Sequence, residues 1–508
     1  MTIYADGNSV TIDDVLAVAH KQAEVALSET TWTAVKKCRA FVEDIADGDA
    51  PVYGINTGFG MLSDVKIEKS HLEDLQINLI RSHAIAVGEP FPREVVRAIM
   101  FLRINVLAKG FSGISVATLS LLIDLLNRDI CPYIPSQGSV GASGDLAPLS
   151  HLALLLAGEG FVMNHEGEKV LTAEYFMQHD ITPVRLKAKE GLALINGTQV
   201  MTAVAVMAIE KVRKIVTLSD IALAMTIDSI QGSIKPFDKK VHEVRAHRGQ
   251  AETAQNIRTL LTDSEINESH HLCTKVQDAY SLRCAPQVHG SIRDALRHVE
   301  SVVTTEINSS TDNPLIFPNE QETISAGNFH GEPIGLVMDY LSAAVSEVAS
   351  ISERRIEQLI NPIFNDHIPA FLAPQKGLNS GFMIVHVTAA SLASENKTLC
   401  FPATVDSIPT SAGKEDHVSM GTTAARKTAM IAENSFKVIV LELLSAAQAL
   451  DFRKPLTSSP AIDAVFKEIR TVVPFMKEDY FIHPQFENLY GIADSLIGIA
   501  EEKCGTLL

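Results

Sequence analysis

Cysteine is scarce in this sequence, and its six cysteines are never closely paired. They are spread from Cys38 to Cys504, and none forms a C-x-x-C pair. Small secreted domains need closely spaced cysteines for a disulfide framework, and structural zinc sites commonly use C-x-x-C pairs. Both classes are therefore disfavoured, and a cytoplasmic location is expected. His242 and His247 miss the zincin spacing by one residue, so the sequence predicts no metal site.

Positive charge and long apolar runs are also lacking. The chain has 43 Lys and Arg against 61 Asp and Glu, a net charge of −18, whereas nucleic acids and anionic membranes require a basic surface. Residues 1–14 carry acids and no apolar core, and residues 200–209 are only half a membrane span. We therefore expect a soluble protein that binds no nucleic acid or membrane and whose partner is a small molecule or another protein.

Helical patterns dominate the 508 residues, of which 46% are hydrophobic. Thr11 followed by Asp14 predicts a capped helix start, with a helical period continuing to about Leu27. From Pro333, apolar residues recur at spacings of three and four as far as Ile351, which is typical of a long bundle helix.

The clearest β signal lies at residues 161–163 and 169–171, which predict a short hairpin. We therefore predict a mostly α fold with little β structure. An N-terminal domain, residues 1–226, is expected to precede an elongated α-helical bundle, residues 227–508, because the composition changes after about residue 226.

A glycine-rich loop at residues 137–146 reads Gln-Gly-Ser-Val-Gly-Ala-Ser-Gly-Asp-Leu. It lacks the lysine that follows the glycines of a P-loop, and Asp145 stands where a nucleophile elbow has its final glycine. Taken alone, the segment is equally well explained as a turn before a helix that begins near Asp145.

A different chemistry is open to Ala142, Ser143 and Gly144 in this loop. The Gly144 nitrogen can attack the Ala142 carbonyl carbon if the chain is sharply bent, because glycine tolerates the required dihedral angles and alanine crowds the ring little. Loss of two waters, one of them from the Ser143 side chain, then gives 4-methylidene-imidazole-5-one (MIO). This ring is an electrophile of a kind that no standard side chain supplies.

Four further segments carry groups suited to a site. Tyr53 heads a loop with glycines at positions 54, 58 and 60, although alone it is more simply explained as a packing residue. Asn196 and Gln277 can hydrogen bond through their amides, and Arg283 offers the planar fork that suits a carboxylate. Phe329 lies in a Gly-Asn-Phe-His-Gly loop before the predicted bundle helix.

In their order along the chain, these segments resemble the aromatic amino acid ammonia-lyase family, and most closely its histidine branch. The resemblance runs from about Val52 to Met420, and residues 138–149, Gly-Ser-Val-Gly-Ala-Ser-Gly-Asp-Leu-Ala-Pro-Leu, are highly specific for the family. It implies that Ala142, Ser143 and Gly144 cyclise autocatalytically to MIO. No external cofactor is then required.

The resemblance also implies roles for other residues. Tyr53 would remove the β-proton of the substrate, which requires the site to favour phenolate or tighten its hydrogen bonding, because a free phenol has a pKa of about 10. Arg283 would grip the substrate carboxylate with help from Asn196. The residues implied to shape the pocket around ring and substrate are Tyr280, Gln277 and Phe329.

Three positions match the histidine branch: His83, Met383 and Glu415. The carboxylate of Glu415 can accept a hydrogen bond from an imidazole N–H, which a phenyl ring cannot provide. Away from this family segment, His83 would be read as a core histidine. The resemblance thus implies conversion of L-histidine to trans-urocanate and ammonia, the first step of histidine degradation, in a homotetramer whose active sites are shared between subunits.

Some positions depart from the family pattern. Lys414 stands where Gln or Asn usually precedes the acid, and its charge can pair with Glu415 and weaken the contact of Glu415 with substrate. Ala279 replaces a proline before Tyr280, and Ile85 with Ala86 replaces an Ala-Gly pair. A tyrosine or phenylalanine ammonia-lyase, a 2,3-aminomutase of the same family, and a helical scaffold whose site has decayed are the alternatives.

Overall fold

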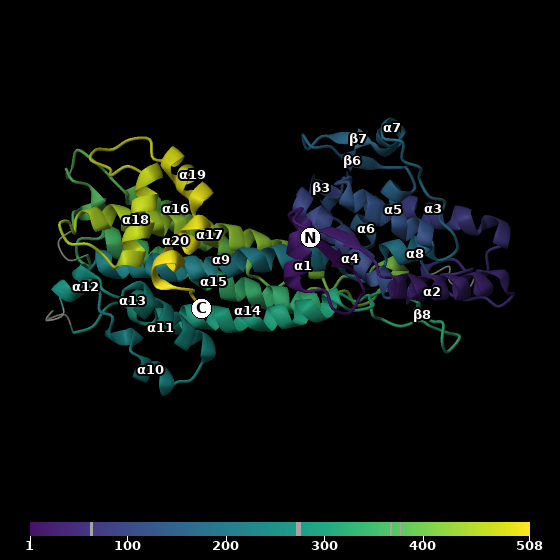
Figure 1. Cartoon of the computed structure of the whole chain (residues 1–508), viewed down its shortest axis with the longest axis horizontal. Helices are drawn as coiled ribbons and strands as arrows, with labels where there is room; N and C mark the ends of the chain where they lie inside the picture. Colours follow the sequence, from purple (N-terminus) through teal and green to yellow (C-terminus); the bar gives the residue numbers. More distant parts are fainter. Residues whose placement is uncertain (61–64, 271–275, 366–367, 376) are drawn as a thin grey trace. The chain divides into compact units, whose positions relative to one another are not determined.

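The computed structural model describes residues 1–60, 65–270, 276–365, 368–375 and 377–508 (Figure 1). Within these ranges the chain is mostly α-helical, as the sequence predicts, with a few strands of two to four residues. The helices are α1 (Ile12–Ala19), α2 (Glu29–Asp47), α3 (Leu72–His83), α4 (Arg93–Ala108), α5 (Val116–Asn127), α6 (Leu146–Leu156), α7 (Thr172–Gln178), α8 (Glu190–Ile195), α9 (Gln199–Ser229), α10 (Lys239–Glu243), α11 (Arg248–Leu260), α12 (Glu265–Ser269), α13 (Tyr280–Arg283), α14 (Ala285–Ile307), α15 (Glu332–Ile360), α16 (Met383–Leu399), α17 (Gly421–Asp451), α18 (Pro460–Val472), α19 (His483–Ile492) and α20 (Ser495–Cys504).

The strands form four small sheets in the described chain. Strand β1 pairs with β2 in parallel, β3 pairs with β5, β4 and β7 flank β6, and β8 pairs with β9, the last three sheets being antiparallel. Their bounds are β1 (Thr2–Tyr4), β2 (Glu24–Ala26), β3 (Val87–Pro90), β4 (Cys131–Pro132), β5 (Pro135–Gln137), β6 (Phe161–Met163), β7 (Lys169–Leu171), β8 (Leu315–Phe317) and β9 (Glu322–Ile324). The predicted hairpin is confirmed as β6 and β7.

The chain divides into two compact units that are not consecutive in sequence. Unit 1 consists of Met1–Ala208, Val299–Asp339 and Pro402–Arg426, and unit 2 consists of Ile209–His298, Tyr340–Phe401 and Lys427–Leu508. This differs from the expected single boundary near residue 226, which lies inside α9. Helices α9, α14, α15 and α17 each contribute residues to both units, and a composition change along the chain cannot detect such interleaving.

Unit 1 is built mainly from helices, which Figure 1 shows with their labels. Helix α4 is buried along almost its whole length and packs against α1, α2 and α5, while α3, α6 and α8 pack against one another. This second group presents the C-terminal end of α3 and the N-terminal end of α6 to the same part of unit 1, where the candidate site lies.

Helix α1 begins where the sequence predicts but ends earlier than predicted. The Thr11 side chain accepts from the Asp14 backbone N–H, and the Asp14 carboxylate accepts from the Thr11 N–H, so the predicted cap is confirmed. The helix ends at Ala19, however, and not near Leu27. Lys21 has φ +60°, which reverses the chain and pairs β2 with β1.

Helix α15 confirms the bundle helix predicted from Pro333. Its apolar stripe is buried, including Ile334, Val337, Leu341 and Val348. By length and composition alone it is long and apolar enough to cross a membrane, but 61% of its apolar window is buried inside the protein. That burial is typical of a core helix, which passes the same test of length and composition.

Unit 2 contains a buried ion pair at the centre of its helices. Arg355 on α15 donates from Nε and Nη2 to both carboxylate oxygens of Glu442 on α17, at 2.6 and 2.8 Å, and both side chains are fully buried. The hydroxyls of Thr226 on α9 and Ser352 on α15 also donate to Glu442. The buried carboxylate is therefore fully hydrogen bonded and joins three helices.

Candidate active site

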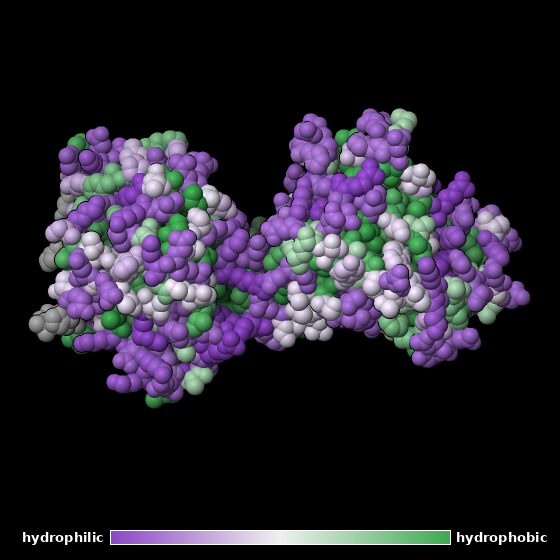
Figure 2. All heavy atoms as spheres, viewed as in Figure 1, coloured by the Kyte–Doolittle hydropathy of each residue, from purple (hydrophilic) through white to green (hydrophobic). Residues whose placement is uncertain are grey.

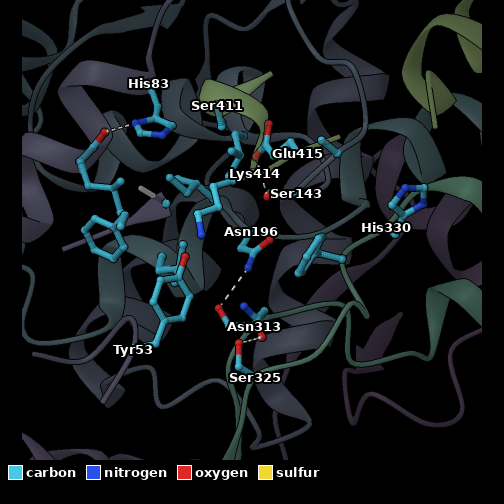
Figure 3. Close-up of a pocket in the computed structure, with 18 of the residues that line it drawn as sticks. Tyr53, His83, Ser143, Asn196, Asn313, Ser325, His330, Ser411, Lys414 and Glu415 are labelled. Carbon is cyan, nitrogen blue, oxygen red and sulfur yellow. Dashed lines mark hydrogen bonds between the residues drawn. The ribbon is translucent and has the colours of Figure 1, made fainter. Parts of the chain in front are cut away.

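Unit 1 contains a cavity of about 840 Å³ lined by residues from six separate stretches of the sequence (Figure 3). Seven sequence-predicted site residues lie in its wall: Tyr53, His83, Ala142, Ser143, Asn196, Phe329 and Glu415. Tyr53 comes from the loop after α2, His83 from the end of α3, and Asn196 from the residue after α8. The predicted clustering of these side chains is therefore seen within a single chain.

The Ala-Ser-Gly loop is sharply bent and tightly packed. Gly141 and Gly144 have φ of +68° and +69°, in the left-handed region that favours glycine. A Cβ on Gly144 would lie 2.1 Å from the carbonyl oxygen of Gly197, so no side chain fits there. Ala142 is buried at 4% exposure, whereas Ser143 is only partly buried and faces the cavity. The loop is therefore bent at two glycines and lies directly against Gly197.

Asp145 anchors this loop to the start of α9. Its fully buried carboxylate accepts from the backbone N–H groups of Val200 and Met201, both at 2.9 Å, and from the hydroxyls of Ser139 and Thr422. Burial raises the pKa of Asp145, and these four hydrogen bonds oppose the rise. The sequence predicted a helix near Asp145, and α6 begins at Leu146, but its anchoring contacts follow only from the tertiary structure.

Glu415 contacts the same loop from the opposite wall of the cavity. The Ser143 hydroxyl donates to Glu415 Oε1 at 2.9 Å, and the Thr410 hydroxyl donates to Oε2 at 2.6 Å (Figure 3). The segment is held against the loop by two further bonds, from Met420 N to the Val140 carbonyl and from the Ser419 hydroxyl to the Gly141 carbonyl. Glu415 was expected in the second domain, whereas it belongs to unit 1, as does Phe329.

Tyr53 is partly buried in the cavity wall. Burial raises the pKa of its phenol, and the nearby carboxylates of Glu415 and Asp312 raise it further, while a hydrogen bond with the Gly60 backbone lowers it. Asp312 is itself buried and pairs with the buried Lys189 at 2.7 Å. A phenol in this position needs an additional favourable charge or hydrogen bond before it can act as a base near neutral pH.

Asn196 is 3% exposed and fixed in orientation. Its Nδ2 donates to the Asn313 carbonyl at 3.1 Å, and its own carbonyl accepts from the buried guanidinium of Arg103. Among the residues that the structure describes, its Oδ1 has no partner although it is buried. This oxygen is therefore an acceptor available to an N–H group of a bound molecule.

His83 ends helix α3 with its ring at the cavity. Nδ1 lies 2.7 Å from the Leu79 carbonyl oxygen, an acceptor, so Nδ1 carries the proton and donates to it. In the neutral form of the ring, Nε2 would then be an acceptor. Together with the Glu415 carboxylate, this nitrogen gives the pocket groups that can hydrogen bond to a polar ring.

Four predicted site residues lie elsewhere in the chain. Gln277 and Arg283 line a separate cavity of about 530 Å³ in unit 2, where Arg283 Nε donates to the Asp278 carbonyl. Tyr280, at the start of α13, is 70% exposed with the Arg283 guanidinium over its ring, and Met383 starts α16. These four residues are not among those that line the cavity in unit 1.

The cavity also contains groups to which the sequence gave no role. Among the described residues, His330, Glu332 and His417 form the one group of three side chains whose ligand atoms lie within 4.8 Å of one another, as a metal site would require. However, His330 Nε2 donates to the His417 carbonyl, and Nδ1 accepts from the Glu332 N–H. Both ring nitrogens of His330 are thus engaged. His330 follows Phe329 in the Gly-Asn-Phe-His-Gly motif, so this motif could have indicated that His330 lies near the site.

The helical fold and this pocket define an aromatic amino acid lyase: residues 10–471 match the aromatic amino acid lyase family, and the chain belongs to it. It is 49% identical over 493 residues to the histidine ammonia-lyase of Myxococcus xanthus, covering 97% of each chain. It is 50% identical over 477 residues to that of Caldanaerobacter subterraneus, covering 94% of this chain and 93% of the relative. The resemblance predicted from the loop motifs is confirmed.

Solved structures agree with this assignment. The histidine ammonia-lyase of Trypanosoma cruzi superposes with a TM-score of 0.92 at 42% identity, covering 99% of this chain and 96% of that one. The tyrosine aminomutase of Streptomyces globisporus superposes with a TM-score of 0.95 at 34% identity over the full length of both chains. The predicted mostly α fold class is confirmed, and the chain is a carbon-nitrogen lyase.

Proposed function

We propose that the protein is a histidine ammonia-lyase that converts L-histidine to trans-urocanate and ammonia. The observation that carries the proposal is the Ser143 to Glu415 hydrogen bond in a cavity that also contains Tyr53 and His83. This contact places the Ala-Ser-Gly loop beside an acid suited to an imidazole. The curated relatives of about half-identical sequence are histidine ammonia-lyases, which supports the same substrate.

The loop geometry fits formation of MIO from Ala142, Ser143 and Gly144. The positive φ of Gly144 and its close approach to Gly197 hold the chain bent. The Gly144 nitrogen attacks the Ala142 carbonyl carbon, and two waters leave, one from that carbonyl oxygen and one from the Ser143 side chain. When formed, the group supplies the electrophile that makes the substrate amine a better leaving group.

The other residues of the cavity bind and position the substrate. Tyr53 accepts the β-proton as a phenolate. Asn196 Oδ1 accepts a hydrogen bond from the substrate amine, because it is the buried oxygen without a partner. Glu415 Oε1 accepts from the single N–H of a neutral imidazole, and this oxygen becomes available when Ser143 loses its hydroxyl. A phenyl ring would leave this carboxylate oxygen without a partner, which disfavours phenylalanine.

The remaining groups are proposed to come from other copies in a homotetramer. Arg283, Gln277 and Tyr280 have no position in the cavity of unit 1, yet a substrate carboxylate needs a cation such as Arg283. Helix α16, which begins at Met383, leaves Ile384 63% exposed and Val387 53% exposed. Figure 2 shows hydrophobic residues scattered among hydrophilic ones on the visible face of the protein. Apolar exposure of this kind supports burial against another subunit.

We propose a cytoplasmic location. The five cysteines in the described ranges, Cys38, Cys131, Cys284, Cys400 and Cys504, are free thiols, as a reducing compartment favours.

The test is product analysis of the purified protein incubated separately with L-histidine, L-tyrosine and L-phenylalanine. We expect urocanate and ammonia in equal amounts from histidine, and an intact mass lower than the encoded mass by two waters. A Ser143→Ala variant is the control, since it cannot lose the second water. Faster release of coumarate or cinnamate, or recovery of a β-amino acid, would contradict the proposal in favour of a tyrosine or phenylalanine lyase or an aminomutase.

A further inference from the structure

Lys414 points into the cavity and carries the fixed positive charge there. Figure 3 shows its side chain extending into the cavity on the side of Tyr53. Of the described residues that line the cavity, it is the only lysine or arginine. The side chain is exposed, so its ammonium group is available to a charge within the cavity.

A tight turn directs Lys414 to this position. The Thr410 N–H donates to the Glu415 carbonyl at 2.9 Å, and the Lys414 N–H donates to the Ser411 carbonyl at 3.2 Å. Ser411 and Ala412 have φ of +50° and +55°, so the turn has a defined and unusual backbone. Both Lys414 and Glu415 therefore enter the cavity from one rigid loop.

Glu415 is not the partner of this lysine. The two Glu415 oxygens accept from the hydroxyls of Ser143 and Thr410. Over the described part of the chain, Lys414 forms no ion pair with Glu415, contrary to the pairing that the sequence suggested. The charge of Lys414 is therefore available to another group.

Tyr53 is the group in the cavity that most needs a positive charge. The ionisable groups that face the cavity with it are His83 from α3, His330 from the loop before α15, and four residues of the segment after α16: Lys414, Glu415, Asp416 and His417. Behind it lies Asp312, paired with Lys189. The carboxylates oppose formation of a phenolate, and Lys414 is the one lysine or arginine among these cavity groups whose positive charge would favour it.

We propose that Lys414 is a positioning residue that acts through Tyr53, its ammonium stabilising the phenolate form of the base. The inference rests on the proposed ammonia-lyase function and adds a residue to it. A positive charge close to a phenol favours the charged form by about one to three pKa units. Because Lys414 is exposed and screened by water and salt, an effect of about one unit is expected here.

The first test is the pH profile of kcat/KM with L-histidine for the wild type, Lys414→Arg and Lys414→Gln. For Lys414→Gln, we expect the acidic limb of the profile to move up by about one pH unit and kcat/KM to recover at high pH. For Lys414→Arg, we expect the acidic limb to stay within about 0.3 unit of the wild-type position. Lys240→Gln, an exposed lysine of α10 in unit 2, controls for the change in net charge. A uniform loss at all pH values, or a higher KM with an unmoved limb, would overturn the proposal.

The second test does not depend on turnover. The absorbance change of tyrosine ionisation is followed with pH in proteins with and without the Tyr53→Phe change, so that the difference reports Tyr53 alone. The proposal expects the Tyr53 transition to move up by about one unit in Lys414→Gln. An unmoved transition would overturn it. Failure of the wild type to release urocanate would instead contradict the proposed function, and this titration would still decide the role of Lys414.

Discussion

The Ser143 hydroxyl donates to Glu415 Oε1 at 2.9 Å, which joins a glycine-rich loop to a segment 272 residues further along the chain. The two side chains act at different stages of the proposed function. Ser143 provides a water that leaves during cyclisation, and Glu415 then accepts from the imidazole of the substrate. A change at either residue should therefore have a distinguishable effect.

Glu415→Gln should impair selection of histidine while leaving MIO formation intact. A hydrogen bond to a charged group contributes about 1.5–3 kcal/mol, so kcat/KM for histidine should fall about 10- to 150-fold. The intact mass should still be lower than the encoded mass by two waters. A variant that keeps the wild-type kcat/KM for histidine would show that Glu415 does not contact the imidazole.

Gly144→Ala should prevent formation of a mature site. The added methyl group would meet the Gly197 carbonyl oxygen at 2.1 Å, and φ of +69° strains any residue other than glycine. We expect the mass to lack the loss of two waters, together with no detectable urocanate. Gly491→Ala in α19 is the matched control, because its Cβ would have open space, and it should mature normally. A mature Gly144→Ala protein would contradict the bent geometry.

The activity should rise with pH through the neutral and mildly alkaline range. A base acts only when deprotonated, and burial raises the pKa of Tyr53 above its ordinary value, so phenolate becomes more abundant as the pH increases. Below that pKa, kcat/KM should rise about tenfold per pH unit. Tyr53→Phe should lose about 10²- to 10⁴-fold and the rising limb with it. A flat wild-type profile between neutral pH and the alkaline limit would argue against Tyr53 as the base.

Mixed subunits should recover activity lost in each variant alone. Tyr53 lies in the cavity of unit 1, whereas Arg283 lies at a different cavity in unit 2. If subunits share active sites, refolding Tyr53→Phe with Arg283→Ala will create some sites in which both residues are native. We expect partial recovery of urocanate release in the mixture. Recovery should be absent when Tyr53→Phe is mixed with the double variant, because every site then lacks Tyr53.

Breaking the buried pair of unit 2 should destabilise the protein strongly. Arg355→Ala would leave the Glu442 carboxylate buried without its cation, which costs about 3–5 kcal/mol. The exposed pair of Lys467 and Asp463 provides the control, since Lys467→Ala should cost no more than about 1 kcal/mol. Denaturation in urea, followed by circular dichroism, measures both. Equal, small effects would show that the buried pair contributes little.

Local features of the fold were predictable from the sequence, and long-range ones were not. The Thr11 cap and the α15 stripe depend on spacings of three and four residues, which are read directly. The early end of α1 depends on the left-handed Lys21 and on pairing of β2 with β1, neither of which has a periodic signal. The division into two units that are not consecutive in sequence likewise depends on long helices, such as α9 and α17, that contribute residues to both units.

Part of the candidate site in unit 1 was predictable from the sequence. The resemblance to the ammonia-lyase family implied that Tyr53, His83 and Asn196 share one site with Ser143, and all four line the cavity of unit 1. The anchoring role of Asp145 was not predictable, since its partners come from α9 and the start of α17. The position of Arg283 at a separate cavity of unit 2 was not predictable either, because the sequence pattern of its segment does not show which cavity it lines.

The close approach of Gly144 to Gly197 limits how this chain can change over evolutionary time. A Cβ on Gly197 would lie 2.5 Å from the Gln199 side chain and 2.8 Å from Thr311. Neither Gly144 nor Gly197 therefore has room for a side chain. A larger residue at Gly144 or Gly197 cannot be compensated by a smaller one at the other position, because glycine is already the smallest residue. Variants of this chain that keep the bent loop should therefore keep glycine at both positions.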